Sequence, residues 1–288
     1  MADLNRYPAD TSYDTIMRAL DHSGAVIIEN LLPADLVADI NRAIDPLIDS
    51  ASMSTEINEY VDAFFGDKVR HISGLAGKSS RFAEEVMCHP LLLAMCDRLL
   101  LPSCSSYQLN LAHLMDRGPG SEQQMIHRDQ DVWVHCVNQQ KNAAAQQDIQ
   151  VACIIALVDF TRDNGATCVV PGSHRWGYDR QPQADELAYA EMPAGSIVLY
   201  RGSTLHAGGG NTTADQWRRG IHMSYCLGWL RTEENNVLAV PPATARSLSK
   251  RAQELLGYGL HDAFSDAGGY LGAVAQRHPT ALLAEGLL

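Results

Sequence analysis

Long apolar runs and basic clusters are both missing from this sequence of 288 residues. No apolar run approaches the roughly 20 residues that a helix needs to span a bilayer, so we expect no membrane partner. Lys and Arg total 22 against 34 Asp and Glu, which gives a formal charge of −12, and no basic cluster is longer than Arg218-Arg219. Because nucleic acid attracts basic surfaces, we expect no nucleic-acid partner either.

Paired cysteines and a secretory signal are missing as well. The seven cysteines are odd in number and scattered, with no C-x-x-C pair of the kind that binds zinc or forms a redox dithiol. We interpret them as reduced thiols that pack as small apolar residues. The first residues, MADLNRYPADTSYDT, do not have the basic-then-apolar pattern of a signal peptide. We therefore expect a cytoplasmic protein.

The composition that remains, 46% hydrophobic and 19% charged, is typical of a globular chain, and we expect one domain over residues 1–288. Its first part, 1–104, has a mainly helical pattern around one short buried strand at 25–29. Apolar residues recur at helical spacing in the segments 15–22, 33–48 and 90–101. The polar segment 58–80 has little periodicity and indicates a loop or lid.

The amino-acid pattern changes at residue 105, where short β-rich segments begin to alternate with Gly, Pro, Asn and Asp. Many short strands with such breaks predict a sandwich or barrel, here a mainly β, cupin-like double-sheet jelly roll over 105–232 with helices packed outside. A polar loop is expected at 138–147, and the tail 233–288 is expected to be partly helical, notably at 243–256. The expected strands are 107–115, 125–134, 149–158, 167–170, 196–200 and 220–230.

Two potential metal ligands, His127 and Asp129, lie two residues apart in the expected strand 125–134, so their side chains should point to one face. A third ligand must come from elsewhere, and His206, which enters a glycine-rich turn, is the best candidate. Two imidazoles and one carboxylate on one face of an octahedron leave three positions open. That geometry suits iron(II), a bidentate 2-oxo acid and O2. With 11 histidines in the chain, the H-x-D pair alone does not establish a metal site.

Further motifs follow this pair in order: N-G-A-T at 164–167, P-G-S-H at 171–174, H-A-G-G-G-N at 206–211 and Arg218-Arg219. In these motifs, over roughly residues 15–260, the sequence resembles the phytanoyl-CoA dioxygenase family of iron(II)/2-oxoglutarate-dependent oxygenases. N-N-V-L-A-V-P-P at 235–242 and L-L-G-Y at 255–258 are similar to the branch that modifies meroterpenoids, alkaloids and polyketides. The resemblance implies a jelly-roll core, a homodimer, and a small, largely apolar secondary metabolite as substrate.

The resemblance also implies a co-substrate site. In this family an arginine about a dozen positions after the distal histidine binds the far carboxylate of 2-oxoglutarate, which the planar guanidinium matches, and Arg218 fits that spacing. Arg219 is the alternative, because adjacent strand residues face opposite ways. Gln124 matches a position that contacts the co-substrate in similar enzymes, and Thr167 is a second candidate donor. Both side chains could instead form local hydrogen bonds that stabilise a turn.

Substrate contacts are expected from inward-facing strand residues and from the lid. The amide of Asn110 would be costly to bury without a partner, which favours a solvated or substrate-facing position, and Gln108 shares its face. Trp133 could form an aromatic wall. The remaining candidates could equally belong to the core or surface: Phe64, Phe65, Arg70 and Met115.

The reaction that this reading predicts is oxidation of the substrate by a dioxygenase that uses Fe(II), 2-oxoglutarate and O2 and releases succinate and CO2. Hydroxylation, desaturation, epoxidation and rearrangement all remain open. Halogenation is disfavoured, because related halogenases have a small residue where this chain has Asp129. Two alternatives from other classes also remain, a cupin-type metal-binding module and a zinc-dependent isomerase or hydrolase without oxygen chemistry.

Overall fold

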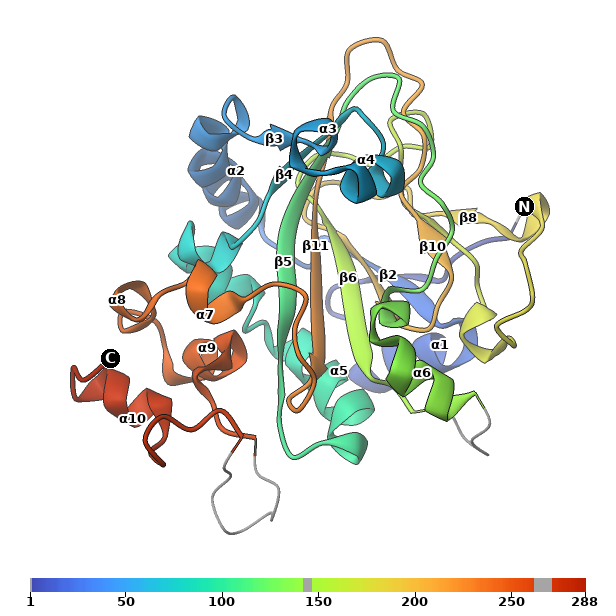
Figure 1. The fold of residues 1–288 in the computed structure, drawn as a ribbon. Coiled ribbons are helices and arrows are strands. Elements are labelled where there is room, and N and C mark those ends of the chain that lie inside the picture. Colours follow the sequence, from blue (N-terminus) through green and yellow to red (C-terminus); the bar gives the residue numbers. More distant parts are fainter. Residues whose placement is uncertain (1, 142–146, 262–270) are drawn as a thin grey trace. The chain divides into compact units, whose positions relative to one another are not determined.

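The computed structural model describes residues 2–141, 147–261 and 271–288, and Figure 1 labels its elements. The strands are β1 (Arg6–Pro8), β2 (Ala25–Glu29), β3 (Ser52–Met53), β4 (Val69–Ile72), β5 (Tyr107–Arg117), β6 (Gln150–Ala156), β7 (Cys168–Val169), β8 (Ala188–Tyr189), β9 (Ile197–Arg201), β10 (His206–Ala207) and β11 (Arg218–Leu227). The α-helices are α1 (Tyr13–Ser23), α2 (Ala34–Ile48), α3 (Ser54–Ile57), α4 (Glu59–Phe65), α5 (Pro90–Leu100), α6 (Val134–Gln140), α7 (Asn236–Ala239), α8 (Pro242–Ala245), α9 (Lys250–Gln253) and α10 (Pro279–Ala284).

The strands of the described residues form two β-sheets. The larger has the order β1-β2-β9-β6-β11-β5-β4-β3 and the smaller the order β10-β7-β8. Strand β1 runs parallel to β2, whereas β9 is antiparallel to β2 and β6, and β4 is antiparallel to β3 and β5. In the small sheet β7 is antiparallel to β10 and β8. This is the expected double-sheet jelly roll with flanking helices.

The chain divides into two units, residues 1–72 with 114–222 and residues 73–113 with 223–288. The core of the first unit includes residues from both sheets. Ile27, Ile154 and Val198 lie opposite one another across β2, β9 and β6, and they share one buried cluster with Val169 and Ala188 of the small sheet. Because strand side chains alternate, Tyr200 lies on the same face as Val198. Burial of each large apolar side chain contributes about 1.5–3 kcal/mol and stabilises this face of the larger sheet.

Helices α1 and α2 of the first unit begin and end close to the predicted residues. Ser12 caps α1 by accepting a hydrogen bond from the backbone N–H of Thr15, and Gly24 ends the helix in the left-handed conformation, with φ of 74°. Helix α2 buries its apolar residues at the predicted four-residue spacing, which confirms the expected helix. Those residues are Leu36, Ile40, Ile44 and Ile48.

The second unit contains α5, predicted for 90–101 and observed over Pro90–Leu100, with Pro90 in its first turn. The expected helix at 243–256 is wrong as a single helix. Helix α8 ends at Ala245, Ser249 caps a separate α9, and a π-helical turn follows over Glu254–Tyr258. The cap side chain of Ser249 accepts a hydrogen bond from the backbone N–H of Ala252, so a new helix starts there instead of the first one continuing.

Two other local expectations are wrong. Residues 125–134 do not form a strand: within that segment the β-pairing is the isolated bridge of His127, and Asp129–Trp133 is a 3-10 helix. The acidic D-Q-D sequence favours this turn over a strand.

The segment 58–80 is not simply a loop, because it contains α4 and β4, and β4 is held between two neighbouring strands. In the expected loop 138–147, residues 138–140 belong to α6, and 142–146 lie outside the described residues.

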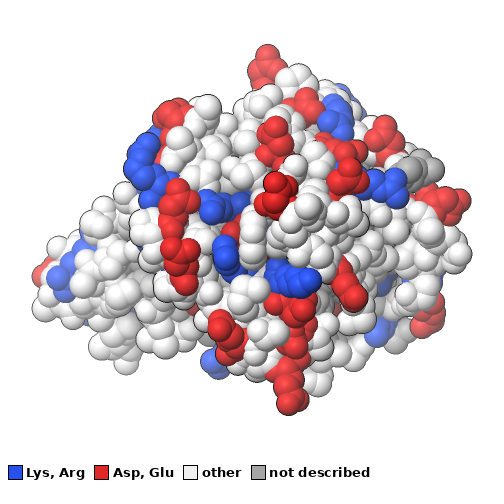
Figure 2. All heavy atoms as spheres, turned by 90° about the horizontal axis from the view of Figure 1, so that it is seen from above, with Lys and Arg blue, Asp and Glu red and all other residues white. Residues whose placement is uncertain are grey.

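None of the described helices is long and apolar enough to cross a membrane. On the face shown in Figure 2, acidic side chains are interspersed among the basic ones.

Candidate metal centre

The three predicted ligands converge in the first unit. His127, Asp129 and His206 each present one ligand atom, and these atoms all lie within 4.8 Å of one another. His206 begins β10, and His127 pairs with it across the isolated bridge, where the backbone N–H of each donates to the carbonyl of the other at 3.0 Å. Asp129 opens the 3-10 helix that follows. Two residues 79 positions apart in sequence are therefore held side by side by main-chain hydrogen bonds.

Both imidazoles are oriented by backbone carbonyls. Nδ1 of His127 lies 2.9 Å from the carbonyl oxygen of Met125, and Nδ1 of His206 lies 3.1 Å from that of Thr204. A carbonyl only accepts, so each Nδ1 carries the proton and donates. In the neutral form of the ring each Nε2 then keeps its lone pair, which is the arrangement that metal-binding histidines have.

The carboxylate of Asp129 is buried between four groups. Its Oδ1 lies 3.3 Å from Nε2 of both His127 and His206. Its Oδ2 accepts a hydrogen bond from the Tyr200 hydroxyl at 3.0 Å and lies 3.1 Å from Nε2 of His222. Burial alone would raise the pKa of Asp129, but the positive charges that His206 and His222 carry when protonated, with hydrogen bonds from His127 and His206, hold that pKa well below its usual range, so the carboxylate stays ionised.

This donor set fits a divalent metal ion. The Nε2 atoms of the two imidazoles each lie 3.3 Å from one carboxylate oxygen, which leaves room for an ion at the roughly 2.0–2.2 Å that such ligands keep when the imidazoles are neutral. Three ligands of this type are the donors of the two-histidine, one-carboxylate site, which leaves positions open.

The structure separates the two candidate arginines. Arg219 donates to Asn41 at 3.0 Å and to Asp45 at 2.7 Å, both on α2. Arg218 is buried in the first unit, where its Nε donates to the carbonyl of Gly165 at 3.1 Å. Among the described residues its Nη1 has no hydrogen-bond partner. A buried, unsatisfied guanidinium nitrogen is costly, and an anionic ligand would satisfy it.

A second buried cation lies near Arg218. Arg117 donates to three backbone carbonyls, those of Phe65, Glu122 and Gly209. Burial lowers the pKa of Arg117 to about 10, and burial together with the charge of Arg117 lowers the pKa of Arg218 to about 9. The first unit therefore carries two desolvated positive charges in its interior.

The other two candidate co-substrate residues lie beside the segment that carries His206. The backbone N–H of Gln124 donates to the carbonyl of Gly208 at 2.9 Å, and its side-chain Oε1 accepts from the N–H of Gly208 at 3.0 Å. Thr167 is buried immediately before β7, which pairs with β10. A co-substrate role for either residue stays a prediction.

Adjacent phenylalanines of α4 face different surroundings. The ring of Phe64 lies 4.7 Å from the ring of His127, edge to face. The ring of Phe65 lies 4.9 Å from that of His71 and packs on the buried cluster that also contains Met115. Phe64 is thus next to the ligand set, while Phe65 and Met115 belong to the packed interior.

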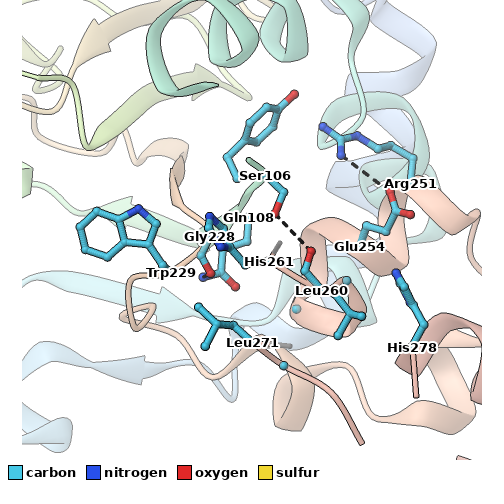
Figure 3. A pocket seen from close by; sticks show the side chains of 14 residues that line it. Ser106, Gln108, Gly228, Trp229, Arg251, Glu254, Leu260, His261, Leu271 and His278 are labelled. Carbon is cyan, nitrogen blue, oxygen red and sulfur yellow. Dashed lines mark hydrogen bonds and ion pairs between the residues drawn. The ribbon is translucent and has the colours of Figure 1, made fainter. Parts of the chain in front are cut away.

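Two of the predicted substrate residues belong to the second unit. The amide of Asn110 donates to Ser224 at 3.1 Å and to Glu233 at 2.6 Å, and its oxygen accepts from the backbone N–H of Glu233. The premise that this amide lacks partners is therefore wrong. Gln108 donates to the carbonyls of Gly228 and Leu230. It lines a cavity of about 340 Å³ whose other lining residues also belong to the second unit, as Figure 3 shows.

The last two candidates also have protein surroundings. The guanidinium of Arg70 lies 3.9 Å from the centre of the Trp217 ring, and its Nη1 lies 3.8 Å from the Asp116 carboxylate. Trp133 is half-buried at the end of the 3-10 helix, so its expected place on a strand is wrong.

Sequence reasoning did not select Tyr200 and His222 as partners of the ligand set. Spacing could have found His222, because it lies four residues after Arg218 in a predicted strand and must share its face. Tyr200 ends a predicted strand six residues before His206, but nothing in its neighbourhood marks it.

Comparison with known proteins gives one family and many relatives. The family model for phytanoyl-CoA dioxygenase (PhyH) matches residues 20–220. The dioxygenase olcK of Penicillium canescens is 31% identical over 247 residues, which cover 85% of this chain and 80% of the relative. The carbocyclase SnoK from nogalamycin biosynthesis superposes with a TM-score of 0.59 at 18% identity, covering 82% of this chain and 93% of that one. The epimerase SnoN, solved with Fe3+, alpha ketoglutarate and nogalamycin RO, gives 0.56 at 16% identity, covering 75% and 84%.

Proposed function

This chain belongs to the phytanoyl-CoA dioxygenase family and is an iron- and 2-oxoglutarate-dependent dioxygenase, and we propose that it holds its metal with His127, Asp129 and His206. The observation that supports this assignment is the convergence of two Nε2 atoms and one carboxylate oxygen within 4.8 Å, with both Nδ1 atoms committed to carbonyls. Iron with 2-oxoglutarate supplies the activation of O2 that side chains cannot perform.

We propose that Arg218 binds the far carboxylate of 2-oxoglutarate. Its unsatisfied Nη1 and the neighbouring charge of Arg117 favour an anion in the interior of the first unit. The ring of Phe160, 4.8 Å from the Arg218 guanidinium carbon, limits how that guanidinium can turn. A pre-positioned guanidinium loses little conformational freedom when it binds a planar carboxylate.

We propose a small, largely apolar secondary metabolite as substrate. Large apolar side chains are exposed on α3, on α4 and around the segment that carries His127 and Asp129: Tyr60 is 71% exposed and Met125 67%, and Ile57, Val132 and Val134 are exposed as well. Tyr60 stacks on Phe64, whose ring contacts His127. Exposed apolar surface of this kind is typical of a binding site. The structure of SnoN with nogalamycin RO is consistent with a substrate of that class.

The reaction that we propose is an oxidation that begins at an apolar carbon of the substrate and yields succinate and CO2. The role of this chain's residues is to hold the reactants and exclude water. The relatives include dioxygenases, a carbocyclase and an epimerase, so several outcomes share this beginning.

The test is anaerobic addition of Fe(II) and 2-oxoglutarate to the purified protein. A weak charge-transfer absorption in the green should appear, and O2 should then give succinate. Asp129→Ala should remove both signals while the circular dichroism spectrum is retained. Succinate formation at the wild-type rate by Asp129→Ala would overturn the ligand assignment. A folded, metal-loaded wild type with no absorption and no succinate would favour a binding or hydrolytic role.

We also propose that the whole chain acts as one oxygenase domain in a cytoplasmic homodimer. Sedimentation equilibrium of the full chain tests the oligomeric part: a mass of twice 31.5 kDa is expected, and 31.5 kDa would contradict it.

A further inference from the structure

The two oxygens of the Asp129 carboxylate have different partners. Oδ1 faces the Nε2 atoms of His127 and His206. Oδ2 faces away from that pair, toward the Tyr200 hydroxyl at 3.0 Å and His222 Nε2 at 3.1 Å. Tyr200 makes a hydrogen bond, whereas His222 lies at ion-pair distance without the geometry of a hydrogen bond. Each oxygen of one buried carboxylate thus meets two groups.

Both partners of Oδ2 are fixed by the fold. Tyr200 is fully buried on β9, between β2 and β6, and its ring also packs 4.4 Å from that of His206. His222 lies on β11, and its side chain is 13% exposed. The buried strand and the ring of His206 restrict Tyr200, and His222 is carried by β11, so we expect both contacts to persist when a ligand binds.

We infer that Tyr200 and His222 are positioning residues that restrict Asp129 to one metal-binding oxygen, an inference that rests on the proposed function. A carboxylate whose two oxygens are both free can chelate an ion and close one of its open positions. With Oδ2 occupied by two neighbours, only Oδ1 remains for the metal. The three positions that a bidentate 2-oxo acid and O2 require are then kept open.

Three variants separate this role from packing and from direct ligation. Tyr200→Phe keeps the ring against His206 and removes only the hydroxyl. His222→Phe removes the ring nitrogens. His222→Gln is the matched control, because its Nε2 can occupy nearly the same place as that of histidine and donate to Oδ2.

The experiment uses the full chain loaded with Co(II), whose visible absorption reports coordination number without turnover. In Tyr200→Phe and His222→Phe we expect an altered Co(II) spectrum, Co(II) binding weakened by about tenfold, and 2-oxoglutarate binding to the Co(II) protein weakened by at least about tenfold. His222→Gln should restore the wild-type spectrum and both affinities.

Other outcomes overturn the inference in distinguishable ways. Unchanged spectra and 2-oxoglutarate affinity in Tyr200→Phe and His222→Phe would show that the two residues only pack. Loss of Co(II) binding in His222→Phe and His222→Gln, to the extent seen in His206→Ala, would make His222 a ligand. If wild-type protein itself bound no Co(II), the proposed metal site would fail, and the positioning role with it.

Discussion

His71 is buried on β4, and its Nε2 lies 2.7 Å from the Ser54 hydroxyl. Burial, with a smaller contribution from the charge of Arg117, lowers the pKa of His71 to about 4. The unfolded chain binds a proton there near pH 6.5, whereas the folded chain does so only near pH 4. Stability should therefore fall as the pH drops from about 6.5 to 4, by about 2 kcal/mol at pH 5. Urea denaturation at pH 8, 6 and 5 measures this loss.

The control for this prediction is His71→Gln, which cannot take up a proton. Its free energy of unfolding should be lower at pH 8 but should fall less between pH 8 and 5. Some slope should remain, because burial also lowers the pKa of His174 to about 4. An equal slope in wild type and His71→Gln would show that His71 is not a source of the pH dependence.

Single residues show where the sequence was informative and where it was not. The H-x-D pair and the order of motifs after it selected His127, Asp129 and His206, which the structure brings together. Asn110 was misread, because its partners Ser224 and Glu233 lie more than a hundred positions along the chain. A buried amide looks unpaired until the partners that tertiary structure supplies are known.

At the end of α1, Gly24 is required for two reasons. Its φ of 74° costs about 1–2 kcal/mol for other residues, and an added Cβ would lie 2.3 Å from His174 Nδ1 and 2.8 Å from Thr204 Oγ1. Gly24→Ala should therefore lower the free energy of unfolding by more than about 2 kcal/mol, as measured by urea denaturation.

The matched control for the helix end is Gly172→Ala. Gly172 has a similar φ of 82°, but a Cβ there meets nothing within 4 Å. This variant should lose only the backbone cost of about 1–2 kcal/mol. Equal losses in the two variants would show that the close approach of His174 and Thr204 to Gly24 has no energetic consequence.

The two phenylalanines of helix α4 should have different roles, one in stability and one in substrate binding. Phe65 packs on the core, so Phe65→Ala should destabilise the protein by about 2 kcal/mol or more. Phe64 contacts His127, so Phe64→Ala should cost less stability but reduce succinate formation that depends on added substrate. Denaturation curves and succinate assays with a metabolite panel measure the two effects. The reverse pattern would mean that the two rings have been assigned the wrong roles.

Elements with a clear local pattern, among them α2 and the strands β5, β6, β9 and β11, were predicted well, whereas the segment that carries His127 and Asp129 was not. Helix α2 has its own apolar period, and Gly24 marks the end of α1 in the sequence itself. The segment 125–134 looked like a strand because of its composition. Its actual conformation depends on the bridge between His127 and His206 and on the turn at Asp129. The D-Q-D sequence favours the turn locally, but no local pattern predicts the bridge to His206.

The balance of charge across the whole molecule leads to the last prediction. The chain is acidic overall, yet Arg117 and Arg218 are buried together in the first unit. Burial and the charge of Arg117 both destabilise the Arg218 guanidinium, and the charge of Asp116 offsets this only in part, so Arg218→Met should leave the ligand-free protein as stable as wild type or more stable by about 1–4 kcal/mol. If Arg218 binds 2-oxoglutarate as proposed, the arginine is retained at the expense of stability because the co-substrate needs it.

Binding of 2-oxoglutarate should reverse that difference. At a hundred times its Kd it should stabilise the metal-loaded wild type by about 2.7 kcal/mol and raise the Tm accordingly. Arg218→Met should keep the stabilisation by metal alone and lose most of the additional effect of 2-oxoglutarate. The dimethyl ester of 2-oxoglutarate, which carries no charge, should not raise the Tm of either protein. If 2-oxoglutarate stabilised Arg218→Met as much as wild type, the interior guanidinium would not be its binding group, and Arg219 or Gln124 would have to be tested in its place.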